Sequence, residues 1–290
     1  MTDLVLLRSL KVAIVGLGLM GGSMALGLRG KCAGLLGIEP DETIRKIALD
    51  RNVVDEISED PKPILLIADA IVLAAPVGVI IDTLKVLPEI SPGNSFVIDL
   101  GSTKRKILEE MEKLPVRFEV VGGHPMCGKE KSSLLYADSC LFDKAPFVLC
   151  ELPRTTQRVR QFAMELISAV GANPVWMDAD QHDRWVAATS HFPYLLSQAL
   201  TLSTPEDASP LIGPGFHSTT RLAGSSVHMM LDILTTNQDH VLSQLSRFED
   251  QLNLIKISIE NGNIVELSEI LSTGRQYHEA LTLPKEPFDN

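Results

Sequence analysis

The chain has 290 residues, of which 45% are hydrophobic and 22% are charged, so it is long enough for two ordinary domains, each with its own core. Its formal net charge of −11 argues against nucleic acid as a partner. The short polar start MTDLVLLRSLK does not fit a signal peptide, and no apolar run reaches the ~18 residues of a membrane span, so we expect a cytoplasmic protein.

The first predicted element is an apolar strand over residues 12–15, which leads into three glycines with the spacing G-x-G-x-x-G. A helix over 19–29 is expected to follow. Gly16 suits the tight turn, Gly18 lets the backbone approach a pyrophosphate, and Gly21 lets the helix pack closely on the strand. The helix N-terminus then offers N–H groups and a positive dipole end to phosphates. The segment therefore predicts a dinucleotide site.

The second predicted strand, 35–39, ends in Glu39, about 20 residues after the glycines, where a carboxylate accepts hydrogen bonds from an adenosine ribose. Asp41 follows closely. Two carboxylates and no arginine at this turn predict NAD rather than NADP. The other expected cofactor contacts are Leu19, Met20 and Pro76.

Strand and helix alternate up to about residue 178. Further strands are predicted at 70–76, 95–100, 119–123, 146–151 and 174–178. Helices are predicted at 41–51, 77–87, 102–114 and 154–169, the third with Ser102 as its N-cap. This alternation predicts an α/β fold with a Rossmann-type, doubly wound, mostly parallel sheet. We assign it to residues 1–179 as the dinucleotide-binding domain.

From residue 180 to 290 the pattern is helical, with no convincing strand, and predicts a second domain for substrate binding and dimerisation. Helices are expected at 181–202, with a kink at Pro193, and at 227–261 and 263–281, with an irregular Gly/Pro-rich stretch at 209–226. The helices carry more apolar surface than one subunit can cover. A homodimer through this domain is therefore expected.

Ligands of a doubly wound sheet bind at the carboxyl ends of its strands. Two loops expected there carry polar side chains: one holds Ser102 and Lys104, and the other holds His124 between a Gly pair and a proline. A histidine with a pKa near ~6.5 can accept a hydroxyl proton at neutral pH, so His124 is the candidate catalytic base. A purely structural histidine is the alternative. Ser102 can donate to substrate or to His124, and Lys104 either is solvated or faces the site.

The helical domain adds two candidates for substrate binding. His191 precedes Phe-Pro, and the proline opens the local hydrogen-bond ladder, so the imidazole either serves a site or is structural. Arg221 lies in the irregular stretch among apolar neighbours, where a poorly hydrated arginine needs a structural or a substrate carboxylate. The adjacent pair of His182 and Asp183 either supports the site or caps a helix.

Lys129 and Lys131 are the next candidates for a cation that meets the substrate. The four cysteines show no metal-ligand spacing, and the sequence has no HExxH, so no metal is expected. Free thiols in a reducing compartment are the simpler interpretation of these cysteines.

Five motifs, in this order along nearly the whole chain, resemble the prephenate/arogenate dehydrogenases of tyrosine biosynthesis. They are VGLGLMGGSMALGL, DLGSTK, GGHPMCGKEKS, HD…SHFPYLL and GF…TTRLA. The resemblance implies a Rossmann-type domain, an all-helical domain that forms a homodimer, and NAD-dependent oxidative decarboxylation. The substrate would be prephenate, giving 4-hydroxyphenylpyruvate, or arogenate, giving tyrosine.

The resemblance also implies roles for single residues. His124 would accept the proton of the ring 4-hydroxyl as hydride leaves that carbon, and Ser102 would help to hold the hydroxyl and the cofactor. His191 would contact the substrate, and Arg221 would bind a substrate carboxylate. Two departures concern substrate-facing elements: Lys129 stands where many members have Thr, and Gly-Ser-Ser-Val at 224–227 replaces a segment with Asp and Pro.

Two other functions compete. A β-hydroxyacid dehydrogenase of the hydroxyisobutyrate type shares the GLGxMGxxMA opening but would place a catalytic lysine in the helical domain, and residues 181–255 contain no lysine. A non-catalytic NAD-binding sensor would keep the sheet and lose the chemistry. The candidate catalytic and substrate-binding residues argue against a sensor. The sequence leaves prephenate versus arogenate, and feedback by tyrosine, undecided.

Overall fold

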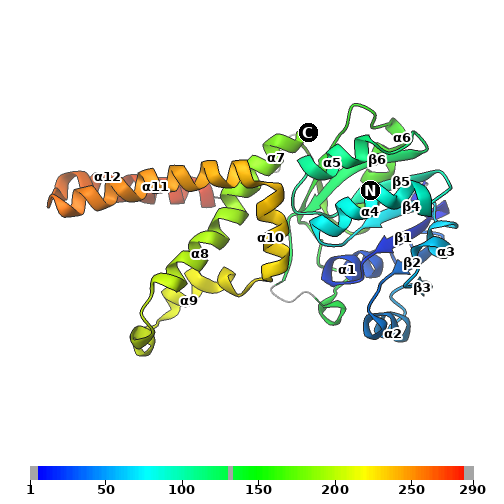
Figure 1. Ribbon diagram of the computed structural model, residues 1–290, viewed down its shortest axis with the longest axis horizontal. Helices are drawn as coiled ribbons and strands as arrows, with labels where there is room; N and C mark the ends of the chain where they lie inside the picture. Colours follow the sequence, from blue (N-terminus) through cyan, green and yellow to red (C-terminus); the bar gives the residue numbers. More distant parts are fainter. Residues whose placement is uncertain (1–5, 130–132, 284–290) are drawn as a thin grey trace.

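The computed structural model describes residues 6–129 and 133–283 of the chain (Figure 1). A sheet with helices on both faces lies on one side, and a helical region extends away from it. The strands are β1 Lys11–Val15, β2 Gly34–Ile38, β3 Glu56–Ser58, β4 Ala70–Leu73, β5 Ser95–Asp99, β6 Phe118–Pro125, β7 Pro146–Cys150 and β8 Asn173–Trp176.

The eight strands form one sheet in the order β3-β2-β1-β4-β5-β6-β7-β8. All neighbouring pairs are parallel except β6 and β7, which are antiparallel. The strand order reverses between β1 and β4, and a ligand crevice forms at such a switch point. The predicted doubly wound, mostly parallel sheet is confirmed. Strand β3 was missed by the sequence analysis, because a three-residue strand is too short to show a period.

Helices cover both faces of the sheet. They are α1 Leu19–Leu28, α2 Glu42–Asp50, α3 Pro61–Leu65, α4 Val77–Ile90, α5 Arg105–Glu112 and α6 Gln157–Ala169. Val12 and Ile14 of β1 point to the layer of α1, α2 and α6, whereas Ala13 points to that of α3, α4 and α5. The central parallel strands β1, β4 and β5 are therefore buried on both sides, which is why they are nearly continuous apolar runs.

The helical region begins at residue 179. It contains α7 Ala179–Val186, a π-helical turn Ala187–His191, α8 Phe192–Ser203, α9 Pro214–Thr220, α10 Val227–Thr236, α11 Gln238–Glu260 and α12 Ile264–Thr282. The kink expected at Pro193 takes the form of the π-turn, after which the proline occupies the first turn of α8. The stretch 209–226 is less irregular than expected, because it contains α9 and a 3-10 turn, Arg221–Gly224, and the end of another 3-10 turn, Glu206–Leu211.

The helix predicted over 227–261 is broken at Asn237, which separates α10 from α11. The prediction of one helix was wrong because the apolar period continues through the break, whereas the Asn237 side chain is fully buried and bonds outside its own helix. Asn237 has φ −129° and ψ 31°, which interrupts the helical ladder.

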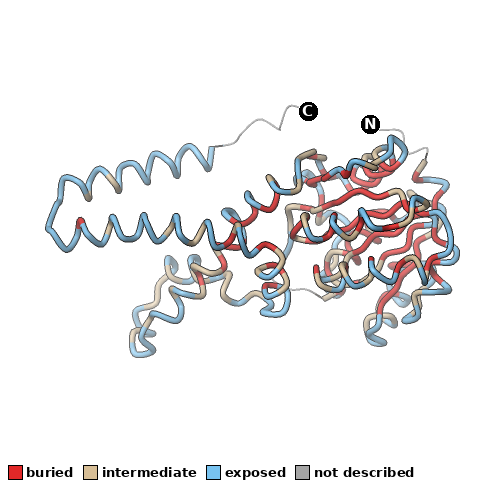
Figure 2. The backbone as a smooth tube through the Cα atoms, turned by 45° about the horizontal axis from the view of Figure 1, so that its top comes forward, coloured by how far each residue is buried: buried red, intermediate tan, exposed pale blue. Residues whose placement is uncertain are grey.

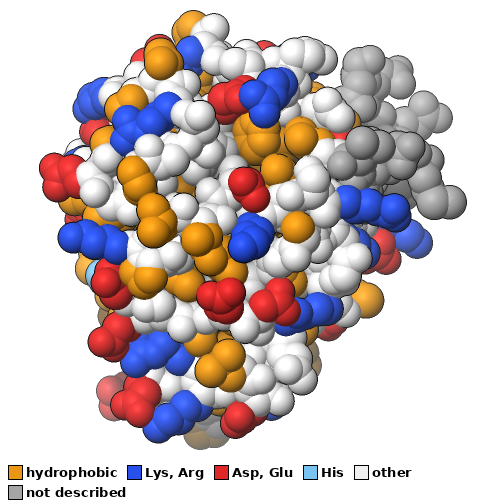
Figure 3. Space-filling model, turned by 90° about the vertical axis from the view of Figure 1, so that its right-hand side faces the viewer, with side chains coloured by type: hydrophobic (Ala, Val, Ile, Leu, Met, Phe, Trp, Pro, Cys, Tyr) orange, Lys and Arg blue, Asp and Glu red, His pale blue; other side chains and the backbone are white. Residues whose placement is uncertain are grey.

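Burial divides the molecule unevenly. Figure 2 shows the sheet and its helices largely buried, and the α11–α12 hairpin largely exposed. On the face in Figure 3, acidic and basic side chains are interspersed rather than separated. Within residues 6–129 and 133–283, no helix is both long and apolar enough to cross a membrane.

Candidate active site

The glycine turn between β1 and α1 has the geometry that its spacing predicts. Gly16 has φ +89°, and a Cβ there would lie 2.8 Å from the Ala74 carbonyl oxygen of β4's end. A Cβ on Gly21 would lie 1.9 Å from the Gly16 oxygen. Neither position admits a side chain, so the glycines allow the turn, the start of α1 and the end of β4 to pack closely. This cradle fits the pyrophosphate of a dinucleotide.

The remaining predicted cofactor contacts lie at the carboxyl ends of β1 and β4. Gly18 immediately precedes α1, and Leu19 and Met20 form the first residues of that helix. Pro76 is exposed and precedes α4. Because β1 and β4 are neighbours, all four residues border the switch point. Their contact with a cofactor remains a prediction.

Glu39 follows β2 and is buried. Its carboxylate accepts hydrogen bonds from the backbone N–H groups of Leu17, at 2.8 Å, and Asp41, at 3.1 Å, which ties it to the glycine turn. The expectation that no arginine lies at this turn was wrong. Arg45 of α2 donates to the carbonyl oxygens of Glu39 and Pro40, and it bonds Glu59 as well. The side chain of Arg45 reaches back from α2 to a turn six residues earlier, and the residues next to Glu39 give no sign of this contact.

His124 lies within β6 and not on a loop, contrary to the prediction. Residues Gly122–Pro125 pair with antiparallel β7, and His124 stands opposite Val148. The strand was expected to end at 123 because the Gly pair and the following proline resemble a turn signal. A strand fixes the imidazole's backbone more firmly than a loop.

A buried ion pair holds this part of β6. Lys104 and Asp99 are both fully buried, and the Lys104 ammonium bonds the Asp99 carboxylate and the Gly123 carbonyl oxygen. The same carboxylate accepts hydrogen bonds from the N–H groups of Gly101 and Gly123, at 2.8 and 3.0 Å. The structure excludes the alternative that Lys104 is solvated, because its side chain is fully buried. It anchors the strand that carries His124.

Ser102 does not cap a helix, so that prediction was wrong. Helix α5 begins at Arg105, and Ser102 lies in the bend that precedes it, partly exposed. The helix start is satisfied instead by Asp183 of α7, whose carboxylate accepts from the N–H groups of Lys104 and Arg105, at 2.7 and 2.9 Å. A carboxylate 79 residues away in the sequence replaces the local cap.

A chain of hydrogen bonds joins β6 to α7. Nδ1 of His124 lies 2.8 Å from Nε2 of His182, and Nδ1 of His182 lies 2.8 Å from Oδ1 of Asp183. The two imidazole rings meet edge to face, with their centroids 5.0 Å apart. His182 and Asp183 are buried, whereas His124 keeps partial exposure. Both interpretations of the His182–Asp183 pair therefore hold: His182 contacts the candidate base, and the Asp183 carboxylate caps α5.

His191 is buried in the π-turn beside the same chain. Its Nδ1 lies 3.2 Å from Nδ2 of Asn237, and that amide also donates to the Asp183 backbone oxygen at 2.7 Å. The second bond fixes the amide orientation, so His191 accepts at Nδ1. Asn237 was not a candidate in the sequence, although an asparagine within a helical pattern is a weak signal of a break.

Burial governs protonation here. It lowers the pKa of His124 well below the usual value, and positive charge on His182, on Lys104 or on His191 lowers that pKa further. Burial also lowers the pKa of His182, and that of His191 to about 4. Burial acts to raise the pKa of Asp183, but the hydrogen bonds that it accepts outweigh this and lower it. Three neutral imidazoles and one carboxylate therefore stand together at neutral pH.

The other predicted substrate residues are more peripheral. Arg221 lies in a 3-10 turn after α9, and this turn packs against α8. The residue is exposed in the single chain, so the prediction of a poorly hydrated arginine was wrong. Lys129 donates to the Tyr136 oxygen and pairs with Asp138 at 3.3 Å, which satisfies its charge within the protein. Lys131 lies outside the described residues.

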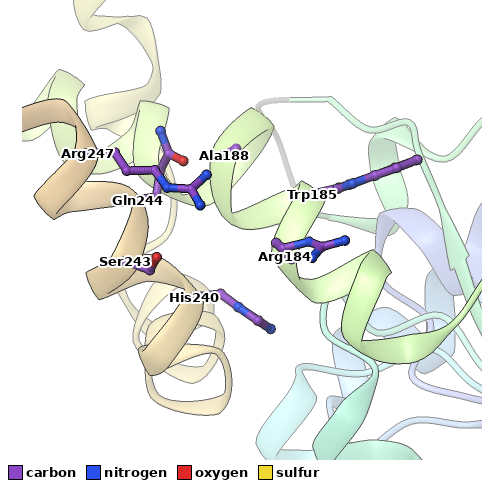
Figure 4. Close-up of a pocket in the computed structure, with 7 residues that line it drawn as sticks. All are labelled: Arg184, Trp185, Ala188, His240, Ser243, Gln244 and Arg247. Carbon is purple, nitrogen blue, oxygen red and sulfur yellow. The ribbon is translucent and has the colours of Figure 1, made fainter. Parts of the chain in front are cut away.

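A cavity of about 220 Å³ lies between α7 and α11 (Figure 4). Its lining residues are Arg184, Trp185, Ala188, His240, Ser243, Gln244 and Arg247. None of the candidate catalytic residues lines it, although His182 and Asp183 lie on the same helix. Among the described residues, no group of three or more His, Cys, Asp or Glu side chains is arranged to hold a metal ion.

Comparisons with known proteins give one family. Residues 24–175 match the model of the prephenate dehydrogenase nucleotide-binding domain, and residues 178–273 match that of its dimerization domain. Prephenate dehydrogenase of Lactococcus lactis is 31% identical over 291 residues, which cover 97% of this chain and 80% of that protein.

Two solved structures are similar over nearly their whole length. Prephenate dehydrogenase from A. aeolicus, in complex with hydroxyphenyl propionate and NAD+, has a TM-score of 0.87 and 31% identity, over 95% of this chain and 99% of that one. Arogenate dehydrogenase from Synechocystis has a TM-score of 0.79 and 29% identity, over 94% and 100%.

Proposed function

Because this chain belongs to the prephenate dehydrogenase family, we propose that it is an NAD-dependent enzyme that oxidatively decarboxylates prephenate to 4-hydroxyphenylpyruvate, or arogenate to tyrosine. The observation that carries the proposal is His124. It is a neutral, partly exposed imidazole on β6, two strands from the β4 edge of the switch point in a dinucleotide-binding sheet. The matched family models argue against the β-hydroxyacid dehydrogenase and sensor alternatives.

The proposed chemistry assigns one proton to the protein. His124 accepts the proton of the substrate's ring hydroxyl, so that the C–O bond gains double-bond character as hydride leaves the same carbon. When bound, NAD supplies the acceptor for that hydride. The ring carboxylate then departs as carbon dioxide, and the ring becomes aromatic. The aromatisation supplies driving force, so positioning of the groups is the protein's main task.

The substrate side of the site is proposed from the same motifs. We assign Ser102 to the ring hydroxyl, because it lies two residues before Lys104, which bonds the Gly123 oxygen next to His124. We assign His191 to the substrate, because it lies beside the hydrogen-bond chain to His124. Arg221 remains our candidate for a substrate carboxylate, since its planar fork can make two parallel hydrogen bonds. Lys129 stays the next candidate, because its pair with Asp138 at 3.3 Å joins two side chains that are each about half exposed and is therefore weak.

The two domains have separate tasks in this proposal. Residues 1–179 bind the cofactor, and residues 180–290 complete the substrate site and form a homodimer. The α11–α12 hairpin supports the dimer, because Leu252, Ile257, Ile264, Val265 and Leu271 are each at least half exposed on it. All four cysteines are free, which fits the reducing cytoplasm that we propose as the location.

Turnover assays test the function directly. Purified protein is incubated with NAD and either prephenate or arogenate, and NADH is followed by absorbance, with carbon dioxide release as a second readout. We expect NADH formation with at least one of the two substrates. Failure with both would exclude the proposed function.

The cofactor preference is expected to follow from Glu39. We expect kcat/KM for NADP to be lower than for NAD by about tenfold or more, or about 1.4 kcal/mol, because a 2′-phosphate would meet the carboxylates of Glu39 and Asp41. Arg45 lies at the same turn, but its guanidinium already donates to the Glu39 and Pro40 carbonyl oxygens and to Glu59. Glu39→Gln should reduce the difference in kcat/KM between NAD and NADP, since it removes one negative charge. Glu42→Gln, with an exposed side chain one turn away, is the matched control. Equal kcat/KM for both cofactors in the parent protein would contradict the assignment.

Arg221→Lys tests the carboxylate contact. A lysine keeps the charge but loses the bidentate fork, so we expect KM for the substrate to rise by about tenfold, the equivalent of about 1.4 kcal/mol, with a smaller change in kcat. NAD binding and thermal stability should stay close to those of the parent. The control is Arg275→Lys on α12, where the guanidinium pairs with Glu279. An unchanged KM would show that another group binds the carboxylate.

A further inference from the structure

The hydrogen-bond chain from Asp183 to His124 can be assigned proton by proton. The Asp183 carboxylate accepts from the backbone N–H groups of Lys104 and Arg105, and a group that already accepts two such bonds is ionised. It can only accept. Nδ1 of His182, 2.8 Å from that carboxylate, must therefore carry a proton.

The second link follows from the first. Since His182 is neutral and protonated at Nδ1, its Nε2 has a lone pair and accepts. Nδ1 of His124, 2.8 Å away, must then be the donor. A neutral imidazole has one N–H, so Nε2 of His124 is unprotonated and free to act as a base.

We propose that Asp183 and His182 are positioning residues, which hold His124 in the tautomer with the proton on Nδ1 and stabilise the imidazolium formed when its Nε2 takes a proton. The proposal rests on the proposed function. In the reacting step the substrate O–H bond breaks and the Nε2–H bond forms, while the Nδ1 proton stays on His124. The new positive charge is then hydrogen-bonded to His182 and, through it, to the negative charge of Asp183.

The other charged groups around His124 do not stabilise its imidazolium form. The other charged or titratable groups near the His124 ring are Lys104 and its partner Asp99, beside the same strand, and His191. Positive charge on His182, on Lys104 or on His191 opposes a positive charge on His124, so His182 supports the imidazolium only in its neutral form. The Asp99 charge is already paired with Lys104. Asp183 is thus the carboxylate linked to His124 by hydrogen bonds, and its link passes through His182.

Two substitutions at one position separate the links. An asparagine amide reaches about as far as Nδ1 of histidine, so His182→Asn can still bond Asp183 but leaves His124 without an acceptor. A glutamine amide reaches about as far as Nε2, so His182→Gln can accept the His124 Nδ1–H. We expect His182→Asn to lower kcat at least about tenfold. His182→Gln should restore part of that loss, because the glutamine accepts from Nδ1 of His124 but does not reach the Asp183 carboxylate. KM for NAD should be unchanged in both.

A second histidine–carboxylate pair, between α7 and α11, serves as a matched control for the His182 substitutions. Nε2 of His240 on α11 donates to the Asp180 carboxylate of α7 at 2.9 Å, which makes a histidine–carboxylate pair outside the hydrogen-bond chain to His124. His240→Asn removes that pair, and we expect the kcat of the parent protein. Equal losses in His182→Asn and His182→Gln would overturn the proposal, because a merely structural histidine has no reason to be rescued by glutamine.

A spectroscopic measurement does not depend on turnover. In protein labelled with ¹⁵N-histidine, the His124 signals are assigned by their loss in His124→Asn. We expect the parent protein at neutral pH to show the proton on Nδ1 and a bare Nε2, and His182→Asn to show the Nε2–H tautomer. A proton on Nε2 in the parent would overturn the proposal. Absence of turnover with prephenate and arogenate would instead overturn the proposed function, with the tautomer still measured.

Discussion

His124→Asn is expected to lower kcat by about 100- to 10,000-fold, the usual contribution of a positioned general base. Asparagine keeps a polar group of similar size but cannot take a proton at neutral pH. Because the cofactor cradle lies at β1 and β4, the affinity for NAD should barely change. Steady-state kinetics with the preferred substrate and NAD titration of the variant measure both quantities.

The control for this substitution is His278→Asn, at an exposed position on α12. It should leave kcat unchanged. A His124→Asn enzyme with nearly normal turnover would show that the imidazole only supports β6, the structural alternative that the sequence left open.

The same assignment fixes the direction of the pH dependence. His124 is active when neutral, so kcat/KM should rise with pH through its pKa and stay level above it. Burial, with the charges of His182, Lys104 and His191, lowers that pKa well below 6.5. We therefore expect the acidic limb to lie below pH 6.5. His124→Asn should abolish that limb together with most of the rate.

Lys104→Met is expected to destabilise the protein by about 3–5 kcal/mol, because it leaves the fully buried Asp99 charge without its partner. It also removes the donor to the Gly123 oxygen, which helps to hold β6 beside β5. Urea or guanidinium unfolding, followed by circular dichroism, gives the free energy of unfolding.

The matched control lies two residues further along the chain. Lys106 of α5 pairs with Glu109 at 3.0 Å, but both side chains are more than half exposed, so Lys106→Met should change stability by less than about 1 kcal/mol. Adding Asp99→Asn to Lys104→Met should recover part of the loss, because the unpaired charge is removed. Equal effects of the two methionine substitutions would show that the Lys104–Asp99 pair contributes no more than a surface pair.

The sequence by itself determined the cofactor half of the molecule. Val12 to Val15, the glycines and Glu39 lie within about 30 residues, and their order follows local rules: an apolar run forms a buried strand, and a tight turn needs Gly16 at φ +89°. The helical half was also recognised by its period. The resemblance then named the family, because its motifs lie in short uninterrupted stretches.

Only the tertiary structure decided which side chains of the candidate site are hydrogen-bonded to one another. His124 and His182 are 58 residues apart, Lys104 and Asp183 are 79 apart, and Asn237 meets His191 across 46 residues. Such pairings leave no periodic trace, because each is a single contact between elements whose separation is set by the packing of the whole domain. Ser102 shows the consequence. Its position in the sequence is typical of a helix cap, yet the Asp183 carboxylate caps α5 from another helix. A buried carboxylate is costly unless it accepts hydrogen bonds, and the N–H groups at the start of α5 supply them.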